Sequence, residues 1–466
     1  MKDLLYYLTA ITQITVFLIA SYYFVISLFG LFSGVDKNKI YDSPTKRFAM
    51  VVAAYNEELV IENTIESLKS LNYPKELYDI FIIADNCTDN TASISTSLGV
   101  NVFERKNNKK RGKGYALEWM FNKIFTMETD YDGICIFDAD NLISKNFLLE
   151  MDNKLSEGYM VVQGYIDSKN PYDSWITQSY SVSFWNTNRL FQLGRKNLKL
   201  SNQIGGTGFC VHTKILKELG WGSTCLTEDL EFTCKLVLNN YKVGWAHNAI
   251  VYDEKPLTLK QSWKQRKRWM QGFADVSSRF FLKLIHKAYK EKDIIALDCA
   301  LYTIQPFVIL LFGLSTIITF LDAIIPYNDN LFSMSVILSP VIIQIIVIFQ
   351  MAINPLIMVI EKKISKFMFG IFIFYFLSIT TYSHIFDMDN SFINKMIFSL
   401  LLLMVILSIL YMANKRQYLK LFIRYLMYNI YVFTWIPITI QGIIYKKDKE
   451  WSHTKHTRKI RIGEVE

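Results

Sequence analysis

The sequence has few charged residues for its length and no cysteine pair of the C-x-x-C type. Charged residues make up only 20% of the 466 residues and hydrophobic residues make up 51%, a balance that excludes a disordered or fibrous chain. The six cysteines lack the spacing of a disulfide framework, so we expect reduced thiols in the cytosol. The formal net charge is +9. Much of the excess lysine and arginine flanks apolar stretches, which favours a membrane protein over a nucleic-acid-binding one.

Long apolar runs lie near the start of the chain and after residue 298. The run at residues 4–32 is longer than the roughly 20 residues that cross a bilayer, and it has neither a strongly basic start nor a small-residue cleavage site. We therefore predict a retained transmembrane helix within residues 1–35 rather than a cleaved signal peptide. Four further runs predict a transmembrane bundle over residues 299–413. They are residues 299–321, 331–360, 367–386 and 393–413.

The charges between these runs predict the side of the membrane on which the polar region lies. Lysine and arginine gather at residues 362–366 and 415–420, whereas residues 322–330 and 387–395 are acidic or nearly neutral. Because positive loops stay in the cytoplasm, we predict a multi-pass protein of the cell membrane with its polar region cytoplasmic. The last apolar stretch, residues 421–445, has basic residues at both ends. This favours an interfacial or re-entrant segment over a sixth span, followed by a basic cytoplasmic tail within residues 414–466.

The polar region alternates short apolar stretches with amphipathic ones, which is the signature of βαβ units. We predict an α/β domain with a mostly parallel, Rossmann-like sheet over residues 36–275, inserted between transmembrane helices, and a juxtamembrane interfacial region over residues 276–298. In such a sheet, ligands bind beyond the carboxyl ends of the strands. The predicted strands are residues 48–53, 80–84, 101–104, 133–137 and 243–246. The predicted helices are residues 60–71, 91–98, 114–123, 142–155, 213–219 and 229–238.

Polar residues follow the first two predicted strands and precede a helix. Tyr55 and Glu57 emerge where the first strand ends, although the acids there would serve equally well as a helix cap. Asp85 ends the next strand and is either a turn cap or a site residue. Lys113 stands between two glycines before a predicted helix. Such a loop suits the approach of an ammonium group to a diphosphate, and the alternative is a solvated basic loop.

The sharpest pattern is an apolar strand that runs directly into Asp138-Ala139-Asp140. A strand projects residues two apart on the same side. Two carboxylates supply the hard oxygen ligands of Mg²⁺ or Mn²⁺, with substrate phosphates completing the coordination. The alternative is a pair of solvated acids in a turn, but the apolar strand that leads into the pair favours metal ligation.

Two more motifs lie farther along the polar region. Gly206 and Thr207 belong to a Gly-Gly-Thr-Gly run, which is either a tight turn or a place where the backbone approaches a substrate. Glu228 and Asp229 follow a threonine at the start of a predicted helix. They are either partners of the helix dipole or, for one of them, a general base toward a hydroxyl group.

The last motif is Gln265-Arg266-Lys267-Arg268-Trp269, in a basic helix ahead of the membrane bundle. A cationic helix in this place often meets lipid headgroups. Trp269 also offers an aromatic platform for a sugar, and Arg268 offers a guanidinium group for a pyrophosphate. The spacing leaves both interpretations open.

Together and in this order, the motifs resemble the membrane-embedded family 2 glycosyltransferases, which include cellulose, hyaluronan, chitin and poly-N-acetylglucosamine synthases. The resemblance covers residues 47–273 and the arrangement of one plus four apolar runs. It implies a GT-A fold and an inverting hexosyltransferase that uses Mg²⁺ or Mn²⁺. The implied partners are a UDP-sugar donor, a growing β-linked polysaccharide that is moved across the lipid bilayer, and an accessory export subunit. Nucleic acid is not expected.

The resemblance also implies roles for individual residues. Asp229 would be the general base that deprotonates the acceptor hydroxyl, and Asp138 and Asp140 would form the metal site, with Asp140 the direct ligand. The donor nucleotide and its diphosphate would be bound by Tyr55, Glu57, Asp85, Lys113, Asp138, Gln265 and Arg268. The acceptor would be bound by Gly206, Thr207, Glu228 and Trp269. Residues 203–209 differ from the aromatic-Cys-Gly pattern of cellulose synthases, so cellulose is not favoured.

Two other functions remain open on the sequence. One is the transfer of a single sugar to a lipid, as in ceramide glucosyltransferase-like relatives, and product length distinguishes it from polymerisation. The other is a transporter or receptor that only binds a nucleotide-sugar, which predicts no release of UDP. The basic segment at residues 451–458 either packs on the catalytic domain or lies solvated near the membrane, and a metal site at its two histidines is not favoured.

Overall fold

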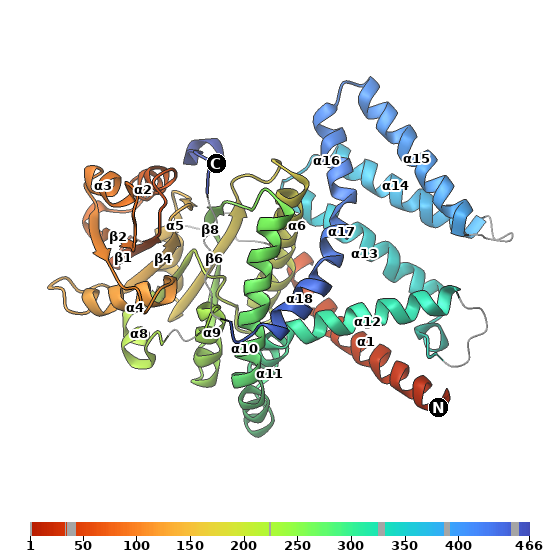
Figure 1. The fold of residues 1–466 in the computed structure, drawn as a ribbon, viewed down its shortest axis with the longest axis horizontal. Helices are drawn as coiled ribbons and strands as arrows, with labels where there is room; N and C mark the ends of the chain where they lie inside the picture. Colours follow the sequence, from red (N-terminus) through yellow and green to blue (C-terminus); the bar gives the residue numbers. More distant parts are fainter. Residues whose placement is uncertain are drawn as a thin grey trace. The chain divides into compact units, whose positions relative to one another are not determined.

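The computed structural model describes residues 2–32, 34, 43–222, 225–324, 331–385, 392–448 and 456–466 and contains two compact units (Figure 1). The sheet unit comprises Tyr23–Pro171, Thr187–Leu310 and Trp435–Glu466, and the helical unit comprises Met1–Tyr22, Tyr172–Asn186 and Leu311–Thr434. Most of the two loops predicted outside the membrane, and residues 451–455 of the tail, lie outside the described residues.

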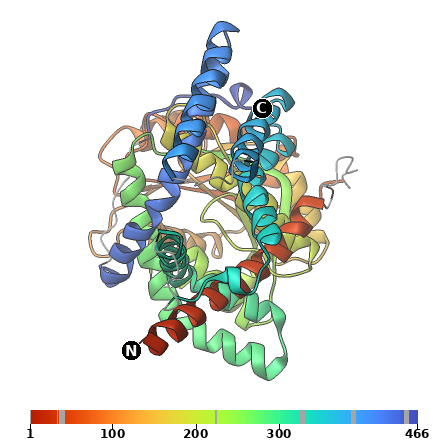
Figure 2. The same ribbon diagram turned by 90° about the vertical axis from the view of Figure 1, so that its right-hand side faces the viewer.

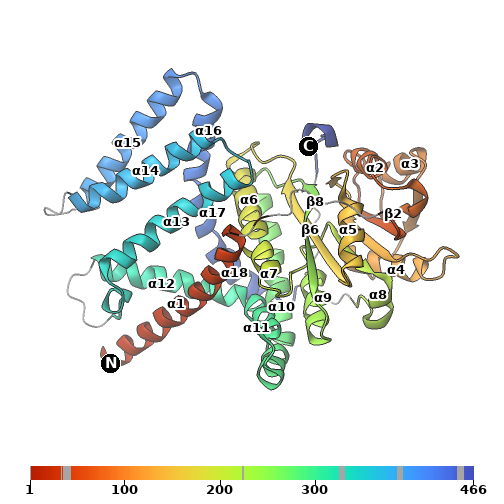
Figure 3. The same ribbon diagram turned by 180° about the vertical axis from the view of Figure 1, so that it is seen from behind.

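One eight-stranded sheet forms the centre of the sheet unit, in the order β3-β2-β1-β4-β7-β6-β8-β5. β1 pairs in parallel with β2 and β4, and β2 pairs in parallel with β3. β6 pairs in parallel with β8, and these two strands lie side by side in Figure 3. β7 is antiparallel to both β4 and β6, and β5 is antiparallel to β8. The predicted mostly parallel α/β fold is therefore confirmed. The strands are β1 (Phe48–Ala54), β2 (Tyr78–Asp85), β3 (Asn101–Arg105), β4 (Gly133–Asp138), β5 (Leu142–Ile143), β6 (Val161–Ser168), β7 (Phe209–His212) and β8 (Val243–Asp253).

Helices cover both faces of this sheet, because its central strands are apolar on both faces. On one face, α2 and α5 pack against a core that contains Val52 of β1. On the other face, α4, α8 and α9 pack against a core that contains Val51 of the same strand (Figure 1). The helices are α2 (Ile61–Lys69), α3 (Thr91–Ser97), α4 (Lys113–Ile124), α5 (Phe147–Ser156), α7 (Gly194–Asn197), α8 (Thr213–Leu219) and α9 (Glu228–Leu238), together with a π-helix at Thr187–Leu193 and a 3₁₀ turn at Lys75–Leu77.

The structure confirms the five predicted strands and corrects one predicted helix. Residues 142 and 143 do not begin a helix; they form β5, paired with Tyr252 and Val251 of β8, and α5 begins at Phe147. Strands β6 and β7 were not predicted. β4 ends at Asp138, so Asp140 lies in the turn beyond the strand rather than on it.

Three packed helices complete the sheet unit: α10 (Leu259–Glu291), α11 (Ile294–Thr303) and α18 (Trp435–Ile444). A capping box at Thr258 and Gln261 starts α10, which continues unbroken past residue 275. The side of Gly442 in α18 lies directly against Met270 of α10, where a Cβ atom would come within 2.4 Å of the Met270 side chain. The absence of a side chain therefore allows α18 to pack closely on α10.

The helical unit consists mainly of apolar helices. Among the described residues, four stretches are long and apolar enough to cross a membrane: Asp3–Phe32, Gln305–Asp322, Pro340–Ile360 and Arg416–Ile444. α1 is one unbroken helix (Figure 2, red), and its Gln13 accepts a hydrogen bond of 2.7 Å from Ser315 of α12. The stretch predicted as interfacial is divided into three helices. The elements are α1 (Lys2–Phe32), α6 (Trp175–Asn186), α12 (Gln305–Ile324), α13 (Pro340–Ile360), α14 (Lys366–Ile385), α15 (Phe392–Met412), α16 (Arg416–Leu426) and α17 (Tyr428–Phe433).

Candidate active site

The candidate site begins at the carboxyl ends of three neighbouring parallel strands. Tyr55 and Glu57 follow β1, Asp85 is the last residue of β2, and Asp138 is the last residue of β4. Because β1 pairs with both β2 and β4, these strand ends lie side by side at one edge of the sheet. The parallel pairing thus gathers side chains that are far apart in the sequence.

Lys113 joins two of the predicted motifs. Its ammonium group pairs with the carboxylate of Asp138 and donates a hydrogen bond of 2.7 Å to the carbonyl oxygen of Gly206. Burial lowers the pKa of Lys113, but attraction to Asp138, Glu228 and Asp229 outweighs this, so the pKa is raised. The ammonium group therefore stays positively charged at neutral pH.

Gln163 of β6 holds the loop that contains the glycine motif. Its side-chain nitrogen donates to the carbonyl oxygens of Thr207 at 2.9 Å and Gly208 at 3.2 Å, and its side-chain oxygen accepts from the backbone N–H of Gly205 at 2.8 Å. Only 1% of Gln163 is exposed, so these groups have little water as an alternative partner. Sequence reasoning missed Gln163, because a single glutamine in an apolar strand forms no motif.

The same loop lies beside the predicted general base. Gly206 has a φ of +83°, and the place of its missing Cβ is 3.4 Å from Oδ2 of Asp229. Oδ1 of Asp229 accepts a hydrogen bond of 2.8 Å from the backbone N–H of Leu230, in the first turn of α9. Thr207 accepts a hydrogen bond of 3.1 Å from the N–H of Asp138. The loop therefore brings Asp138 and Asp229, from β4 and α9, to one place.

The acids at the start of α9 hold their protons more tightly than ordinary carboxyl groups. Burial and the negative charge of Asp229 raise the pKa of Glu228 to about 7, against the opposing attraction of Lys113. Burial also raises the pKa of Asp229, opposed by the N–H of Leu230 and by Lys113. A carboxylate with a raised pKa is a better proton acceptor near neutral pH, which is the property that a general base needs.

The α10 motif contributes a cation and an aromatic pair. Arg268 acts electrostatically on both Glu228 and Asp229 and favours their charged forms. Trp269 stacks on Trp435 of α18, with ring centroids 6.4 Å apart and planes at 21°. Gln265 lies one turn earlier on the same helix. Sequence reasoning missed Trp435, which lies in a late apolar stretch with no motif around it.

Asp85 and Tyr55 each lie against an arginine to which sequence reasoning gave no role of its own. Arg105 forms a buried ion pair with Asp85 at 2.5 Å, and the guanidinium group of Arg111 lies 5.8 Å from the centre of the Tyr55 ring. Burial raises the pKa of Asp85, and Arg105 opposes this. Two cations therefore stand beside the residues predicted to bind the nucleoside.

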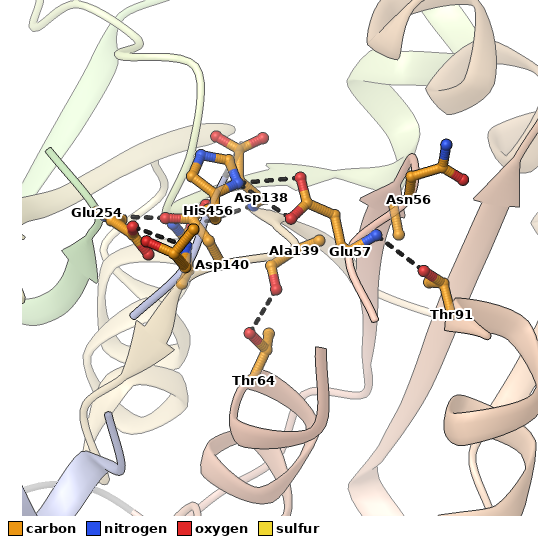
Figure 4. Close-up of polar contacts among 12 residues, drawn as sticks. Asn56, Glu57, Thr64, Thr91, Asp138, Ala139, Asp140, Glu254 and His456 are labelled. Carbon is orange, nitrogen blue, oxygen red and sulfur yellow. Dashed lines mark hydrogen bonds and ion pairs between the residues drawn. The ribbon is translucent and has the colours of Figure 1, made fainter. Parts of the chain in front are cut away.

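Asp140 belongs to a second group of charged side chains (Figure 4). Its Oδ2 accepts a hydrogen bond of 2.8 Å from the N–H of Glu254, and its carbonyl oxygen accepts one of 2.9 Å from Lys169. Nδ1 of His456 lies 3.0 Å from Oε1 of Glu57. Burial raises the pKa of Asp140 to about 7, and the positive charge of His456 opposes this. Sequence reasoning named neither Glu254 nor His456 as a site residue.

The donor atoms at Asp138 and Asp140 suit a hard divalent cation. Carboxylate oxygens are the ligands that Mg²⁺ and Mn²⁺ prefer. Across the part of the chain that the structure describes, no three His, Cys, Asp or Glu side chains form a ready-made metal site. A divalent cation bound at these aspartates would therefore take further ligands from phosphate oxygens or water.

Comparison with known proteins identifies the domain. Residues 44–272 match the family described as "Glycosyltransferase like family 2". Over 246 residues the chain is 29% identical to the beta-monoglucosyldiacylglycerol synthase of Synechocystis, and the matched stretch covers 49% of this chain and 48% of that protein. Over 249 residues it is 27% identical to the poly-beta-1,6-N-acetyl-D-glucosamine synthase of Staphylococcus epidermidis, and the matched stretch covers 51% of this chain and 57% of that protein. The chain thus spans about half the length of the curated relatives that it matches.

A solved structure supports the fold. The mannosyltransferase PcManGT from Pyrobaculum calidifontis, in complex with GDP-Man and Mn²⁺, superposes with a TM-score of 0.50 at 16% sequence identity, covering 70% of this chain and 88% of that one. The GT-A fold expected from the sequence resemblance is thereby confirmed.

Proposed function

Because residues 44–272 belong to glycosyltransferase family 2, we propose that this enzyme is an inverting, metal-dependent and processive transferase. It transfers the sugar of a UDP-sugar to a growing β-linked polysaccharide and passes the chain across the cell membrane, with the sheet unit in the cytoplasm. The observation that supports this most directly is the loop at Gly206, which joins Lys113 and Asp138 to Asp229. Similarity to the poly-beta-1,6-N-acetyl-D-glucosamine synthase supports the polymeric product.

In the proposed reaction, Asp229 takes the proton of the acceptor hydroxyl group. The hydroxyl oxygen then forms a bond to the anomeric carbon while the bond from that carbon to the diphosphate oxygen breaks, and the configuration inverts. The electron pair of the broken bond leaves with UDP. Lys113 and Arg268 lie close enough to Asp229 to act on it electrostatically, so they are placed to stabilise the developing negative charge of the leaving group.

The donor and the acceptor occupy opposite sides of Asp229 in this proposal. Tyr55, Glu57 and Asp85 hold the nucleoside, and Asp138 and Asp140 hold a divalent cation, which would neutralise charge on the leaving diphosphate. Trp269, stacked on Trp435, is the platform on which the acceptor sugar rests.

The test is UDP release by the detergent-purified full chain with Mg²⁺ or Mn²⁺, using UDP-GlcNAc, UDP-glucose and UDP-glucuronate singly and in pairs. Asp229→Asn should reduce turnover by about 10²–10⁴-fold, the contribution typical of a general base, while UDP still binds. Asp130→Asn, at an exposed position, is the matched control and should retain activity. A high-molecular-weight product would support the polymerase, and removal of the metal with EDTA should stop its formation reversibly.

A second candidate is the transfer of one sugar to a lipid, supported by similarity to the beta-monoglucosyldiacylglycerol synthase. Release of UDP with a glycolipid and no polymer would favour it. If wild type and Asp229→Asn release UDP equally, Asp229 is not the base. If no donor is turned over with either metal, the proposed activity itself is contradicted.

A further inference from the structure

The C-terminal part of α1 packs directly on the π-helix and on α7, which follows it, and all three segments belong to the sheet unit. A Cβ atom on Gly30 would overlap the carbonyl oxygen of Arg189 in the π-helix and would lie 2.9 Å from the Cα atom of Leu190. A Cβ atom on Gly194 would overlap the carbonyl oxygen of Ile26. The backbones of α1 and the π-helix are therefore in close contact, at positions where a side chain has no room.

The π-helix holds Gln192 against a segment that lies ten residues farther along the chain. A π-helix of seven residues is unusual, because such turns occur mostly as single bulges inside α-helices and often at functional sites. Nε2 of Gln192 donates a hydrogen bond of 2.8 Å to the carbonyl oxygen of Gln203, and Oε1 accepts one of 3.2 Å from the N–H of Gln203. Only 6% of Gln192 is exposed, so these groups have little water as an alternative partner. Gln192 therefore fixes both backbone groups of Gln203.

Gln203 lies two residues before the 205–208 loop, which adjoins Asp229 at Gly206. Gln163 holds this loop from β6, whereas Gln192 holds the backbone that leads into it. Because so few residues separate the two anchored points, a displacement of Gln192 has to move the loop or break one of these hydrogen bonds. The packing of α1 thus extends through the π-helix to the surroundings of the proposed base.

We propose that Gln192 is a positioning residue for the transfer reaction and that the close packing of α1 at Gly30 sets its place. The proposal rests on the proposed function, because it concerns the geometry around Asp229 during the transfer. Gln192 acts through the 205–208 loop and does not touch the reacting groups. Its loss should therefore slow the transfer step in molecules that still bind the donor nucleotide normally.

The experiment measures UDP release in a single turnover by the detergent-purified full chain with Mn²⁺, using the UDP-sugar that wild type turns over. The rate is expressed per UDP-binding site counted by calorimetry, so that unfolded molecules do not contribute. Gln192→Met keeps much of the side-chain volume and removes the hydrogen bonds. It should slow this rate about tenfold to a hundredfold, the effect of misplacing reacting groups from a distance, while the affinity for UDP stays that of wild type. Gln417→Met, at an exposed position of α16, should change neither quantity.

A second variant tests the contribution of α1. Gly30→Ala adds a Cβ atom that meets the backbone of Arg189 and Leu190, so the π-helix has to shift, and the same step should slow. Gly34→Ala, where no atom lies within 4 Å of the added Cβ, should leave the rate unchanged. Gly30→Ala combined with Gln192→Met should be little slower than Gln192→Met alone, because both changes act through one side chain.

Amide hydrogen exchange of residues 203–208 reports on the loop without any turnover. Exchange should be faster in Gln192→Met and Gly30→Ala than in wild type and the two control variants. A wild-type rate per binding site in Gln192→Met would overturn the inference, as would a loss of UDP affinity that equals the loss of rate, or effects of the two substitutions that multiply. If wild type transfers sugar from no donor, the proposed function fails, while hydrogen exchange still decides whether Gln192 and α1 hold the loop.

Discussion

Lys113 makes two contacts that connect separate parts of the site, one to Asp138 and one to the carbonyl oxygen of Gly206. Lys113→Met keeps much of the side-chain volume and removes the charge. We expect the donor KM to rise about tenfold to a hundredfold, because hydrogen bonds to charged groups contribute about 1.5–3 kcal/mol. Steady-state kinetics with varied UDP-sugar checks this.

Lys109→Met is the matched control for this change, since Lys109 is an exposed residue of the basic loop that precedes α4. It should leave the donor KM unchanged. An equal rise of the donor KM in both variants would mean that the overall positive charge of the loop attracts the donor. The specific contacts of Lys113 would then have no part in donor binding.

The acids at the start of α9 predict the pH dependence of the reaction. Asp229 must be deprotonated to accept a proton, and its pKa and that of Glu228 are raised, the latter to about 7. The rate should therefore begin to fall at a higher pH than an ordinary carboxyl group would give. The measurement is kcat/KM against pH, with the acceptor saturating.

Glu228→Gln removes the negative charge beside Asp229, so the acid limb of this profile should move to lower pH. Glu128→Gln, at an exposed site before β4, should leave the profile in place. A wild-type rate that stays constant down to pH 5 would contradict the role given to Asp229.

Among the secondary-structure elements, β6 has an unexpected part in the site. Its Gln163 holds the 205–208 loop through hydrogen bonds with Gly205, Thr207 and Gly208. Gln163→Leu would leave these buried backbone groups without that partner, at a cost of about 2 kcal/mol or more in the free energy of unfolding. Because the loop lies beside Asp229, we also expect kcat to fall. Thermal unfolding and single-turnover kinetics measure the two effects.

Gln163→Asn shortens the same amide by one methylene and provides the comparison. If the loop needs the full reach of Gln163, the asparagine variant should fold nearly as well as wild type and still turn over slowly. Equal activity of all three proteins would show that Gly206 is held by other contacts.

For the whole chain, the charge pattern predicts that the sheet unit lies in the cytoplasm. Gly463→Cys, at an exposed position in the C-terminal part of the sheet unit, should react with a membrane-impermeant maleimide only after the cells are permeabilised. Ser335→Cys, which precedes α13 at an exposed position, should react in intact cells. The partly exposed Cys87 and Cys225 are first replaced by serine. The opposite labelling pattern would reverse the proposed orientation.

Local patterns in the chain were sufficient to predict much of the architecture. The strands that became β1, β2, β3, β4 and β8 follow from short apolar runs, whose periodicity and flanking turns are readable within ten residues. The motif residues Asp138 and Asp229 were identifiable because Asp138 is the last residue of β4 and Asp229 lies in the first turn of α9. The helix predicted over residues 142–155 was wrong at its start, because β5 has only two residues and exists through its pairing with β8.

Contacts between distant parts of the chain determine the features of the site that the sequence did not predict. Arg105 meets Asp85, Trp435 meets Trp269, and His456 meets Glu57 only after the chain has folded. No spacing rule connects such pairs, because their proximity depends on strand order and on the packing of α18 against α10. The order of apolar and polar residues is therefore enough to specify elements and their edges, whereas the partners that set charge and position in the site are selected by tertiary packing.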